Sequence, residues 1–485
     1  MREIEQIFNK VLQNIQPTEK ELSLIDSIVQ KLTKLLKTRA DALNIQYTDI
    51  EPQGSTGIKQ TQLRNDFDID LFIGLDYEWY KEKYKGLNET KFKKAIKKEF
   101  TKLCKEWIIE ALNPAEFKDP RLLYAEHPYV TVDYITSPNR FEIDIVVYFD
   151  VSLDYIRKHG PITAVDRTPH HSRFIKKHLS EKQKNDVRLL KQFFKACYSY
   201  GDKSPVGRAG FIGYSAELLL YHFNDLLSVF KNFQSLPDNP LDFFGRKEQE
   251  LRTIPHFRKD WLLLIDPIDE NRNVASAISK RAFDYCNYNV NRFLKHPEEL
   301  FFEIKTIPEF KPKPSKELDS HLFVMEFTKK DPEVHYTVLR DKLYSLGDYI
   351  VSHGEKEYDH SPKFGTIIFE VYFNPDKGEY NLALYCEHPV LDKYYERRGP
   401  PLRMEKDVQK FRKKHENCFS RDGFLWVRSK RDCQKFIEFL KTRITSRIPK
   451  SLNLENVSRA INTQRSSGRK ALYVLKHMVL PFKKM

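Results

Sequence analysis

Two short apolar segments with carboxylates at alternate positions constrain this chain more than any other feature. Residues 68–73 are Asp-Ile-Asp-Leu-Phe-Ile, and residues 141–147 are Phe-Glu-Ile-Asp-Ile-Val-Val. Side chains alternate between the two faces of a β-strand, so Asp68 and Asp70 share one face, as do Glu142 and Asp144. The aliphatic residues between them share the opposite face. We therefore expect two strands that each have an acidic face and a packing face.

The acidic faces suggest a cation site. Two carboxylates one strand period apart repel each other unless a cation lies between them, and Mg²⁺ prefers oxygen ligands. If the two strands are neighbours, Asp144 completes a three-carboxylate cluster with Asp68 and Asp70. A solvated edge strand is the alternative, and Glu142 could equally face solvent. A calcium loop extended by Asp66 is disfavoured by the apolar residues that follow and by the absence of EF-hand spacing.

A small polar turn, Gly54-Ser55-Thr56, precedes the first acidic strand. Glycine lets the backbone approach a ligand closely, and the serine hydroxyl and exposed amides can donate to phosphate oxygens. Most Gly-Ser turns are structural, so this turn alone does not define a site.

Composition adds a hint about the partner. The chain has 485 residues, which suggests about three domains, and 82 Lys and Arg against 68 Asp and Glu give a net charge of +14. This surplus favours a polyanionic partner, although a solvated lysine-rich surface explains it equally well.

The longest apolar runs are too short to span a membrane, and the N-terminus lacks the apolar region of a signal peptide. The six scattered cysteines fit free thiols, so we expect a cytoplasmic protein.

The first half of the chain has several helical patterns. Thr18 and Glu21 have the spacing of a capping box ahead of an apolar-periodic stretch. Residues 80–113, 179–200 and 215–230 also have helical periodicity. We expect helices in each of these segments.

The second half has a mixed pattern. A proline-rich linker at 310–315 precedes a predicted strand at 322–327. A helix is predicted to run over 331–347, with Asp331 as N-cap and Gly347 at its end. A turn at 374–378 then joins two predicted strands into a hairpin. This order is typical of a small ferredoxin-like module, and the basic segment 465–469 is predicted to be flexible.

The Gly-Ser turn, the Asp-x-Asp strand and the later Asp strand together form the signature of the polymerase-β-like nucleotidyltransferases, which this chain resembles. Downstream motifs resemble those of the archaeal-type CCA-adding enzymes in particular. The matching segments are 164–171 (Ala-Val-Asp-Arg-Thr-Pro-His-His), 187–191, 200–201, 210–214 with Glu217, 266–275 and, more loosely, 399–401. Their order and approximate spacing are also similar to those of that family.

The resemblance implies an α+β architecture in three parts. Residues 1–158 would form a polymerase-β-like nucleotidyltransferase catalytic domain. Residues 159–285 would form a mostly helical central domain that binds nucleotide and tRNA. Residues 286–485 would form an α+β C-terminal body with the ferredoxin-like tail module, which would bind tRNA.

The resemblance also implies roles for individual residues. The catalytic and metal-binding carboxylates would be Asp68, Asp70 and Asp144. The triphosphate would be contacted by Ser55, with Lys59 and Arg64 as further candidates. The nucleotide's phosphates and sugar would be bound by His171, Lys191 and Tyr200, and its base would be read partly by Arg272. The stretch between Gly54 and Asp68 is one residue longer than in the family, which leaves the phosphate contacts there open.

The implied activity is the template-independent addition of C, C and A to the 3′ end of tRNA from CTP and ATP, with release of pyrophosphate by two-metal catalysis. The expected partners are tRNA and the two nucleotides, with no membrane partner and with a homodimer left open. The expected cofactor is a pair of Mg²⁺ ions, with Mn²⁺ as an alternative. The rival hypotheses are a poly(A) polymerase or nucleotide-signal synthase of the same superfamily, and a non-catalytic RNA-binding relative.

Overall fold

The computed structural model describes residues 2–483 except 67, 125–126, 137–138, 314–316, 333 and 358–360. The chain divides into two compact units. The first comprises Met1–Ala196, Phe211–Ser276 and Asn289–Ile304, and the second comprises Cys197–Gly210, Ala277–Tyr288 and Lys305–Met485. The predicted boundaries at 158 and 285 stay a prediction.

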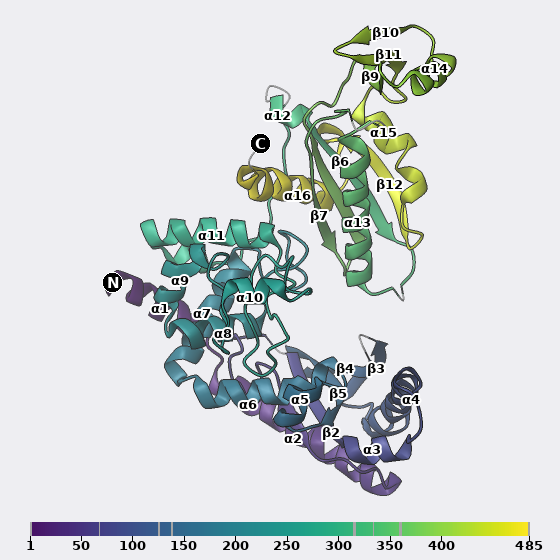
Figure 1. Cartoon of the computed structure of the whole chain (residues 1–485). Helices are drawn as coiled ribbons and strands as arrows, with labels where there is room; N and C mark the ends of the chain where they lie inside the picture. The colour runs from purple at the N-terminus through teal and green to yellow at the C-terminus, as the bar shows by residue number, and fades with distance from the viewer. Residues whose placement is uncertain are drawn as a thin grey trace. The chain divides into compact units, whose positions relative to one another are not determined.

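The first unit combines one mixed sheet with many helices (Figure 1). Its strands are β1 (Ile50–Gln53), β2 (Asp68–Asp76), β3 (Phe117–Tyr124), β4 (Pro128–Thr136) and β5 (Asn139–Asp150). The helices before and within the sheet are α1 (Arg2–Ile15), α2 (Glu19–Leu43), α3 (Tyr77–Lys83), α4 (Glu89–Lys102) and the π-helical turn η1 (Leu103–Ile109). The helices after it are α5 (Leu153–His159), η2 (Ala164–Arg167), α6 (Thr168–His178), α7 (Glu181–Ala196), α8 (Gly213–Phe223), α9 (Leu226–Asn232), η3 (Phe233–Ser235), α10 (Glu248–Thr253) and η4 (Glu299–Phe302).

Helix α2 begins as its sequence predicts. The Thr18 hydroxyl accepts from the backbone of Glu21, and the Glu21 carboxylate accepts in return from the backbone of Thr18, which confirms the capping box. The buried face of α2 packs on the aliphatic face of the sheet, together with α4 and η1. Because these helices cover the aliphatic face of the sheet, the opposite face is the one that they leave uncovered.

The sheet of the first unit has the strand order β1-β2-β5-β4-β3. The two acidic strands, β2 and β5, are parallel neighbours, whereas the other pairs are antiparallel. Ile69, Leu71 and Ile73 are buried in the helix-covered core, so the acidic side chains of both strands project from the opposite face. The prediction of two strands that each have an acidic face is therefore confirmed, and the structure shows that the two strands are neighbours.

The segment 215–230 is helical, as predicted, and is divided between two helices. Asn224 ends α8 with a φ of 73°, and the Asp225 side chain then caps α9 by accepting from the backbone of Ser228. The apolar residues before and after this break keep a helical period, so the periodicity of the sequence does not indicate where one helix ends and the next begins.

The second unit is built on a four-stranded antiparallel sheet. Its strands are β6 (Leu322–Lys329), β7 (Ile367–Asn374), β8 (Glu379–Cys386) and β12 (Leu452–Arg459), and its helices are α12 (Glu317–Ser320), α13 (Tyr336–Gly354), α15 (Phe436–Thr442), η5 (Thr445–Arg447), η6 (Ala460–Asn462), α16 (Ser466–Val474), η7 (Leu475–Val479) and η8 (Leu480–Phe482). A separate small sheet contains β9 (Tyr394–Pro401), β10 (Cys418–Arg421) and β11 (Phe424–Lys430), with α14 (Glu405–Lys414). Helix α11 (Lys280–Lys295) contributes to both units.

The four-stranded sheet has the ferredoxin-like arrangement that the sequence predicts. Its strand order is β12-β6-β8-β7, and α13 and α15 provide the two helices of a βαββαβ succession. The predicted hairpin is present, because β7 and β8 pair on either side of residues 375–378. Helices α13 and α15 pack on one face of the sheet and α16 on the other (Figure 1). The module thus forms the main sheet of this unit, with α16 packed against it, and its predicted place as a tail stays a prediction.

The predicted limits of α13 are wrong at both ends. The helix begins at Tyr336 and is capped by the side chain of His335, not by Asp331. It continues past Gly347 to Gly354. A Cβ on Gly347 would lie 2.3 Å from the ring of Phe369, so this glycine permits close packing on the sheet and does not end the helix.

The predicted flexibility of 465–469 is also wrong. This segment begins α16, and the backbone of Arg465 donates to the buried carboxylate of Glu326 at 2.8 Å. Ser466 and Arg469 both donate to Glu309 at 2.5 Å. Tertiary contacts with these two glutamates fix a segment whose composition favours disorder.

Several smaller expectations concern the whole chain. The predicted linker lies partly outside the described residues, which include its positions 310–313 only. All six cysteines are free, as expected. In the described part of the chain, no helix has the length and apolar character needed to cross a membrane.

Candidate active site

The parallel pairing of β2 and β5 brings the predicted carboxylates together. Asp70 lies directly opposite Asp144 in the register, and Asp68 lies opposite Glu142. On the other side of Asp144, Thr131 of β4 donates from its hydroxyl to the Asp144 carboxylate at 2.5 Å. The central acidic pair is therefore held between two backbone ladders and oriented by a threonine.

The electrostatics of this pair show the strain of packing like charges. Burial raises the pKa of Asp70 to about 7, and the charges of Asp144 and Asp68 act in the same direction, while Lys59 opposes them. Burial also raises the pKa of Asp144 to about 6, against the stabilising hydrogen bond from Thr131. A cation beside these carboxylates would relieve both effects.

The Gly54 turn lies directly against the acidic pair. Gly54 has a φ of 68°, and a Cβ at this position would lie 2.1 Å from the Asp70 carboxylate. The Thr56 hydroxyl donates to the carbonyl of Asp68 at 2.7 Å and so attaches the turn to β2. Glycine is needed here both for its left-handed backbone and for the close approach to a carboxylate.

Helix α7 holds the loop that joins this turn to β2. Arg188, Lys191 and Lys195 lie on one face of the helix, since their spacing is three and four residues. Arg188 and Lys191 donate to backbone carbonyls of residues 60–62, and Lys195 pairs with Asp66 at 3.0 Å. The sequence did not reveal that Arg188 has this role.

A buried glutamate connects the loop to the helices. The Glu217 carboxylate of α8 accepts from Lys59 at 2.8 Å and from the Thr61 hydroxyl at 2.7 Å, and Lys191 lies 3.8 Å away. Glu217 is 1% exposed. Burial would raise the pKa of Glu217, but Lys59 and Lys191 hold it below its usual range. Burial lowers the pKa of Lys191 to about 8.

A second buried cluster surrounds Asp266. This carboxylate accepts from Arg272 at 2.9 Å and from Tyr214 at 2.9 Å, and it lies 2.7 Å from Nε2 of His171. Burial lowers the pKa of His171 to about 4, so the imidazole is neutral at pH 7 and its Nε2–H donates to Asp266. The ring centres of Tyr214 and His171 lie 4.3 Å apart, with the two rings tilted by 30°.

The two clusters form one network. The ammonium of Lys59 lies 4.8 Å from the centre of the Tyr214 ring, between Glu217 and the Asp266 cluster. The network thus extends from Lys191 to Arg272, whose side chain remains 30% exposed. Lys59 and Lys191 are buried against Glu217, so Arg272 is the partly exposed cation of this network that can reach a ligand.

Comparison with known proteins identifies relatives along nearly the whole chain. Residues 185–303 match the family model described as tRNA nucleotidyltransferase, second domain. A CCA-adding enzyme of Methanocaldococcus jannaschii is 27% identical over 472 residues, which cover 94% of this chain and 92% of that protein. One of Methanosarcina mazei is 29% identical, with 84% and 81% covered.

The chain is similar to the archaeal CCA-adding enzymes over most of its length. This relationship confirms the predicted resemblance and the predicted nucleotidyltransferase class. Among solved structures, a cytoplasmic RNA terminal U-transferase is 15% identical, with a TM-score of 0.46 and 63% of this chain covered. E. coli MS115-1 CdnC has a TM-score of 0.41 at 17% identity, with 61% covered. Because these scores lie below 0.5, the relationship depends on the sequence relatives.

Eight of the ten predicted site residues fall into two groups in the first unit. Lys59, His171, Lys191 and Arg272 lie in the polar network, and Asp68, Asp70 and Asp144 lie on the acidic face with Ser55 in the adjoining turn. The guanidinium of Arg64 donates to the carbonyl of Gln16, beyond the end of α1. Tyr200 belongs to the second unit. The binding roles of all these residues stay predictions.

Sequence reasoning missed the residues that organise the site. Asp266 and Glu217 fall in the family-like motifs, but neither was given a role. Tyr214 and Thr131 were not singled out either. One signal for such a residue is a carboxylate within an otherwise apolar helix, as at Glu217. A carboxylate in that position is buried only where cations or hydrogen-bond donors pair with it.

The acidic face suits a hard divalent cation. Asp68, Asp70 and Asp144 offer oxygen donors only, and the raised pKa values of the latter two indicate negative charge that a cation would compensate. Within the described ranges, however, no three His, Cys, Asp or Glu side chains are grouped closely enough to hold a metal ion. The residues fit the chemistry of Mg²⁺, and their role as its ligands stays a prediction.

Proposed function

We propose that this protein is a CCA tRNA nucleotidyltransferase. It adds C, C and A to the 3′ end of tRNA from CTP and ATP, without a nucleic-acid template. One observation carries the proposal: an enzyme named for CCA addition aligns with 94% of this chain and with 92% of its own length. The acidic pair beneath the Gly54 turn supports it, since phosphoryl transfer depends on positioning and charge stabilisation.

In the reaction, the 3′ hydroxyl oxygen of tRNA forms a bond to the α-phosphorus of the nucleotide, and the bond to the pyrophosphate oxygen breaks. The hydroxyl proton is lost and pyrophosphate leaves. Asp70 and Asp144 would lie beside this exchange with Asp68, and Thr131 would keep the Asp144 carboxylate in one orientation. When bound by these carboxylates, two Mg²⁺ ions would polarise the attacking hydroxyl and neutralise charge on the leaving group.

The remaining residues would bind the nucleotide. Gly54 lies against Asp70 and the adjoining Ser55 is half-buried, so phosphate oxygens could accept from the Ser55 hydroxyl and from backbone amides of the turn. Lys191 would supply positive charge, and its low pKa reflects burial that an anionic ligand would compensate. Arg272 keeps part of its guanidinium exposed while Asp266 holds its orientation, which suits recognition of a base edge.

The C-terminal region provides a surface suited to RNA. Three arginines of the small sheet stack on neighbouring rings: Arg421 on Trp426 at 4.1 Å, Arg398 on Phe424 at 4.6 Å and Arg428 on Tyr394 at 4.8 Å. Such guanidinium groups can contact phosphate and stack on unpaired bases. This surface supports tRNA binding by the region 286–485.

The decisive experiment supplies labelled CTP and ATP together with tRNA that lacks its terminal CCA. We expect incorporation to stop after two C and one A. Long A tails would indicate a poly(A) polymerase, dinucleotide products formed without tRNA would indicate a signal synthase, and binding without incorporation would indicate a non-catalytic relative.

Matched variants test the carboxylate assignment. Asp70→Asn and Asp144→Asn should abolish incorporation while tRNA binding persists, because each removes a charge from the acidic pair. Asp154→Asn removes an exposed carboxylate from the first turn of α5 and should leave incorporation unchanged. Incorporation by Asp70→Asn at the rate of this control would refute the assignment.

Three finer points extend the proposal. A metal titration that compares Mg²⁺ and Mn²⁺ in the incorporation assay tests the identity of the ion. A cytoplasmic location follows from the substrate and is tested by fractionation. A homodimer stays a prediction, which light scattering after size-exclusion chromatography would test.

A further inference from the structure

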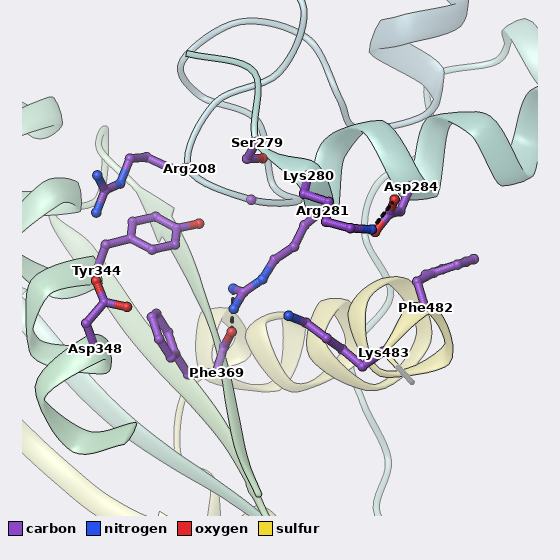
Figure 2. Close-up of a pocket in the computed structure, with 11 residues that line it drawn as sticks. Arg208, Ser279, Lys280, Arg281, Asp284, Tyr344, Asp348, Phe369, Phe482 and Lys483 are labelled. Carbon is purple, nitrogen blue, oxygen red and sulfur yellow. Dashed lines mark hydrogen bonds and ion pairs between the residues drawn. The ribbon is translucent and has the colours of Figure 1, made fainter. Parts of the chain in front are cut away.

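The second unit contains a pocket outside the candidate active site. It has a volume of about 650 Å³ and lies among the Gly207 segment, the start of α11, helix α13, strand β7 and the C-terminal residues (Figure 2). All of its lining residues belong to the second unit. The volume is sufficient for a phosphate group with an attached sugar.

Four cations line the pocket, against two carboxylates. The cations are Arg208, Lys280, Arg281 and Lys483, and the carboxylates are Asp284 and Asp348. Figure 2 shows the ends of Arg281 and Lys483 directed toward the middle of the pocket from opposite sides. Lys280 instead pairs with Asp284 at 2.7 Å. The excess of positive charge indicates an anionic ligand.

The two arginines are held in place by aromatic rings. The guanidinium of Arg281 lies 5.1 Å from the Phe369 ring centre and donates to the Phe369 carbonyl at 2.6 Å. Arg208 lies 5.0 Å from the ring centre of Tyr344, with Asp341 as a weak partner at 3.8 Å. Such stacking fixes a guanidinium while leaving its donor edge available.

A buried carboxylate supports this arrangement from beneath. Glu370 is fully buried and accepts from the Tyr344 hydroxyl at 2.5 Å, from the backbone of Gly207 at 3.2 Å and from Arg281 at 3.2 Å. Glu370 therefore connects three segments that line the pocket: α13 through Tyr344, the loop at Gly207, and α11 through Arg281. Glu370 carries one negative charge and pairs with Arg281, so the four cations still outnumber the three carboxylates, Asp284, Asp348 and Glu370, by one.

Lys483 is the cation of the pocket whose charge is least compensated by carboxylates. Among the residues that the structure describes, it has no ion-pair partner. Partial burial lowers the pKa of Lys483, and the nearby charges of Arg281 and Lys280 lower it further. Lys280 is also the first residue of α11, a helix of 16 residues, so the positive end of the helix dipole faces the same pocket. An anion in the pocket would remove these repulsions.

We propose that this pocket binds a phosphodiester group of the tRNA backbone, through Arg281 and Lys483 with support from Arg208 and Lys280. The proposal rests on the proposed function for its choice of RNA. Free nucleotide carries the same phosphate-ester chemistry and is the other source that the pocket could accept. An RNA backbone phosphate is favoured because the pocket belongs to the same unit as the ring-stacked arginines of the small sheet and to a different unit from the carboxylates.

The test measures tRNA affinity separately from catalysis. Lys483→Ala and Lys280→Ala alter exposed side chains, so the fold is retained, and Lys441→Ala of α15 is a matched control that does not line the pocket. Fluorescence anisotropy with labelled tRNA gives Kd at several salt concentrations. Lys483→Ala should weaken binding roughly 10-fold and reduce the salt slope of log K by about 1, as for loss of one phosphate contact. The control should change neither quantity.

Three outcomes decide the proposal. An increase in Kd for tRNA with an unchanged KM for CTP and ATP supports it. An increase in KM for the nucleotides with an unchanged tRNA Kd assigns the pocket to free nucleotide and overturns it, as does a change no larger than that of Lys441→Ala. Because anisotropy needs no turnover, a wild-type protein that fails to incorporate CMP would refute the proposed function and leave this test intact.

Discussion

Replacing Glu217 with glutamine tests whether the buried network is held together by charge. Glu217 is the carboxylate that pairs with Lys59 at 2.8 Å and approaches Lys191 at 3.8 Å. Glutamine has the same shape and can still accept from Thr61, but it leaves two buried ammonium groups without a counter-charge. The change therefore removes charge with little change in packing.

The expected cost follows from the burial of the pair. The side chains of Lys59 and Glu217 are 9% and 1% exposed, and breaking a buried ion pair costs about 3–5 kcal/mol. For a unit of this size, a loss of 3 kcal/mol corresponds to a fall in Tm of about 6–12 °C. The pKa of Glu217 is lowered in the folded state, so its contribution is present above the ordinary glutamate pKa and is lost as the pH falls through the lowered value.

The assay is thermal unfolding at pH 7, with a surface ion pair as the control. Lys184 pairs with Glu181 at 2.7 Å, but Glu181 is 79% exposed, so Glu181→Gln should cost at most about 1 kcal/mol. The double variant Lys59→Met with Glu217→Leu should recover part of the loss, because it removes the uncompensated charge of Lys59. If Glu217→Gln lowers Tm no more than Glu181→Gln does, the reasoning is refuted.

Three further predictions concern the site. Gly54→Ala should reduce incorporation about 100-fold or more, because the added Cβ would overlap the Asp70 carboxylate. Gly86→Ala is the control: Gly86 also has a left-handed backbone, with a φ of 86°, but open space surrounds it, so this change should cost only the backbone strain of about 1–2 kcal/mol. His171 has a pKa lowered to about 4, so the unfolded chain takes up a proton first as the pH falls, and the stability from this group should decline by about 3 kcal/mol between pH 6.5 and pH 4. Denaturant titrations that compare wild type with His171→Gln at each pH would detect this decline, and parallel pH profiles would contradict it. Mg²⁺ should raise the Tm of the wild type but not that of Asp70→Asn, as measured by thermal unfolding with and without chelator; equal shifts in both proteins would exclude Asp70 as a ligand.

Local sequence signals predicted the features that local interactions decide. The capping box of Thr18 and Glu21 joins residues three apart, and the hairpin of β7 and β8 closes through a four-residue turn. The acidic alternation in 68–73 also specified which side chains share a face, since the period of a strand is fixed by its backbone. Each of these features involves neighbours in the chain, so their residue types sufficed.

Positions that depend on distant partners were predicted poorly. Gly347 has the composition of a helix end, but close packing against Phe369 accounts for it. The basic segment at Arg465 has the composition of a flexible loop, but the buried carboxylate of Glu326 anchors it. In both cases, the residue that decides the outcome is more than 20 positions away in the sequence.

The sequence alone determined that this chain carries paired carboxylates on strands, a glycine turn before them and a set of family-like motifs. Only the tertiary structure decided that Asp70 faces Asp144, because strand neighbours are chosen by the burial of whole faces and not by local pattern. It also decided that Glu217 and Asp266 organise the cations around the site. A buried charge is stable only where opposite charges and hydrogen-bond donors from other segments contact it. Only folding brings those segments together.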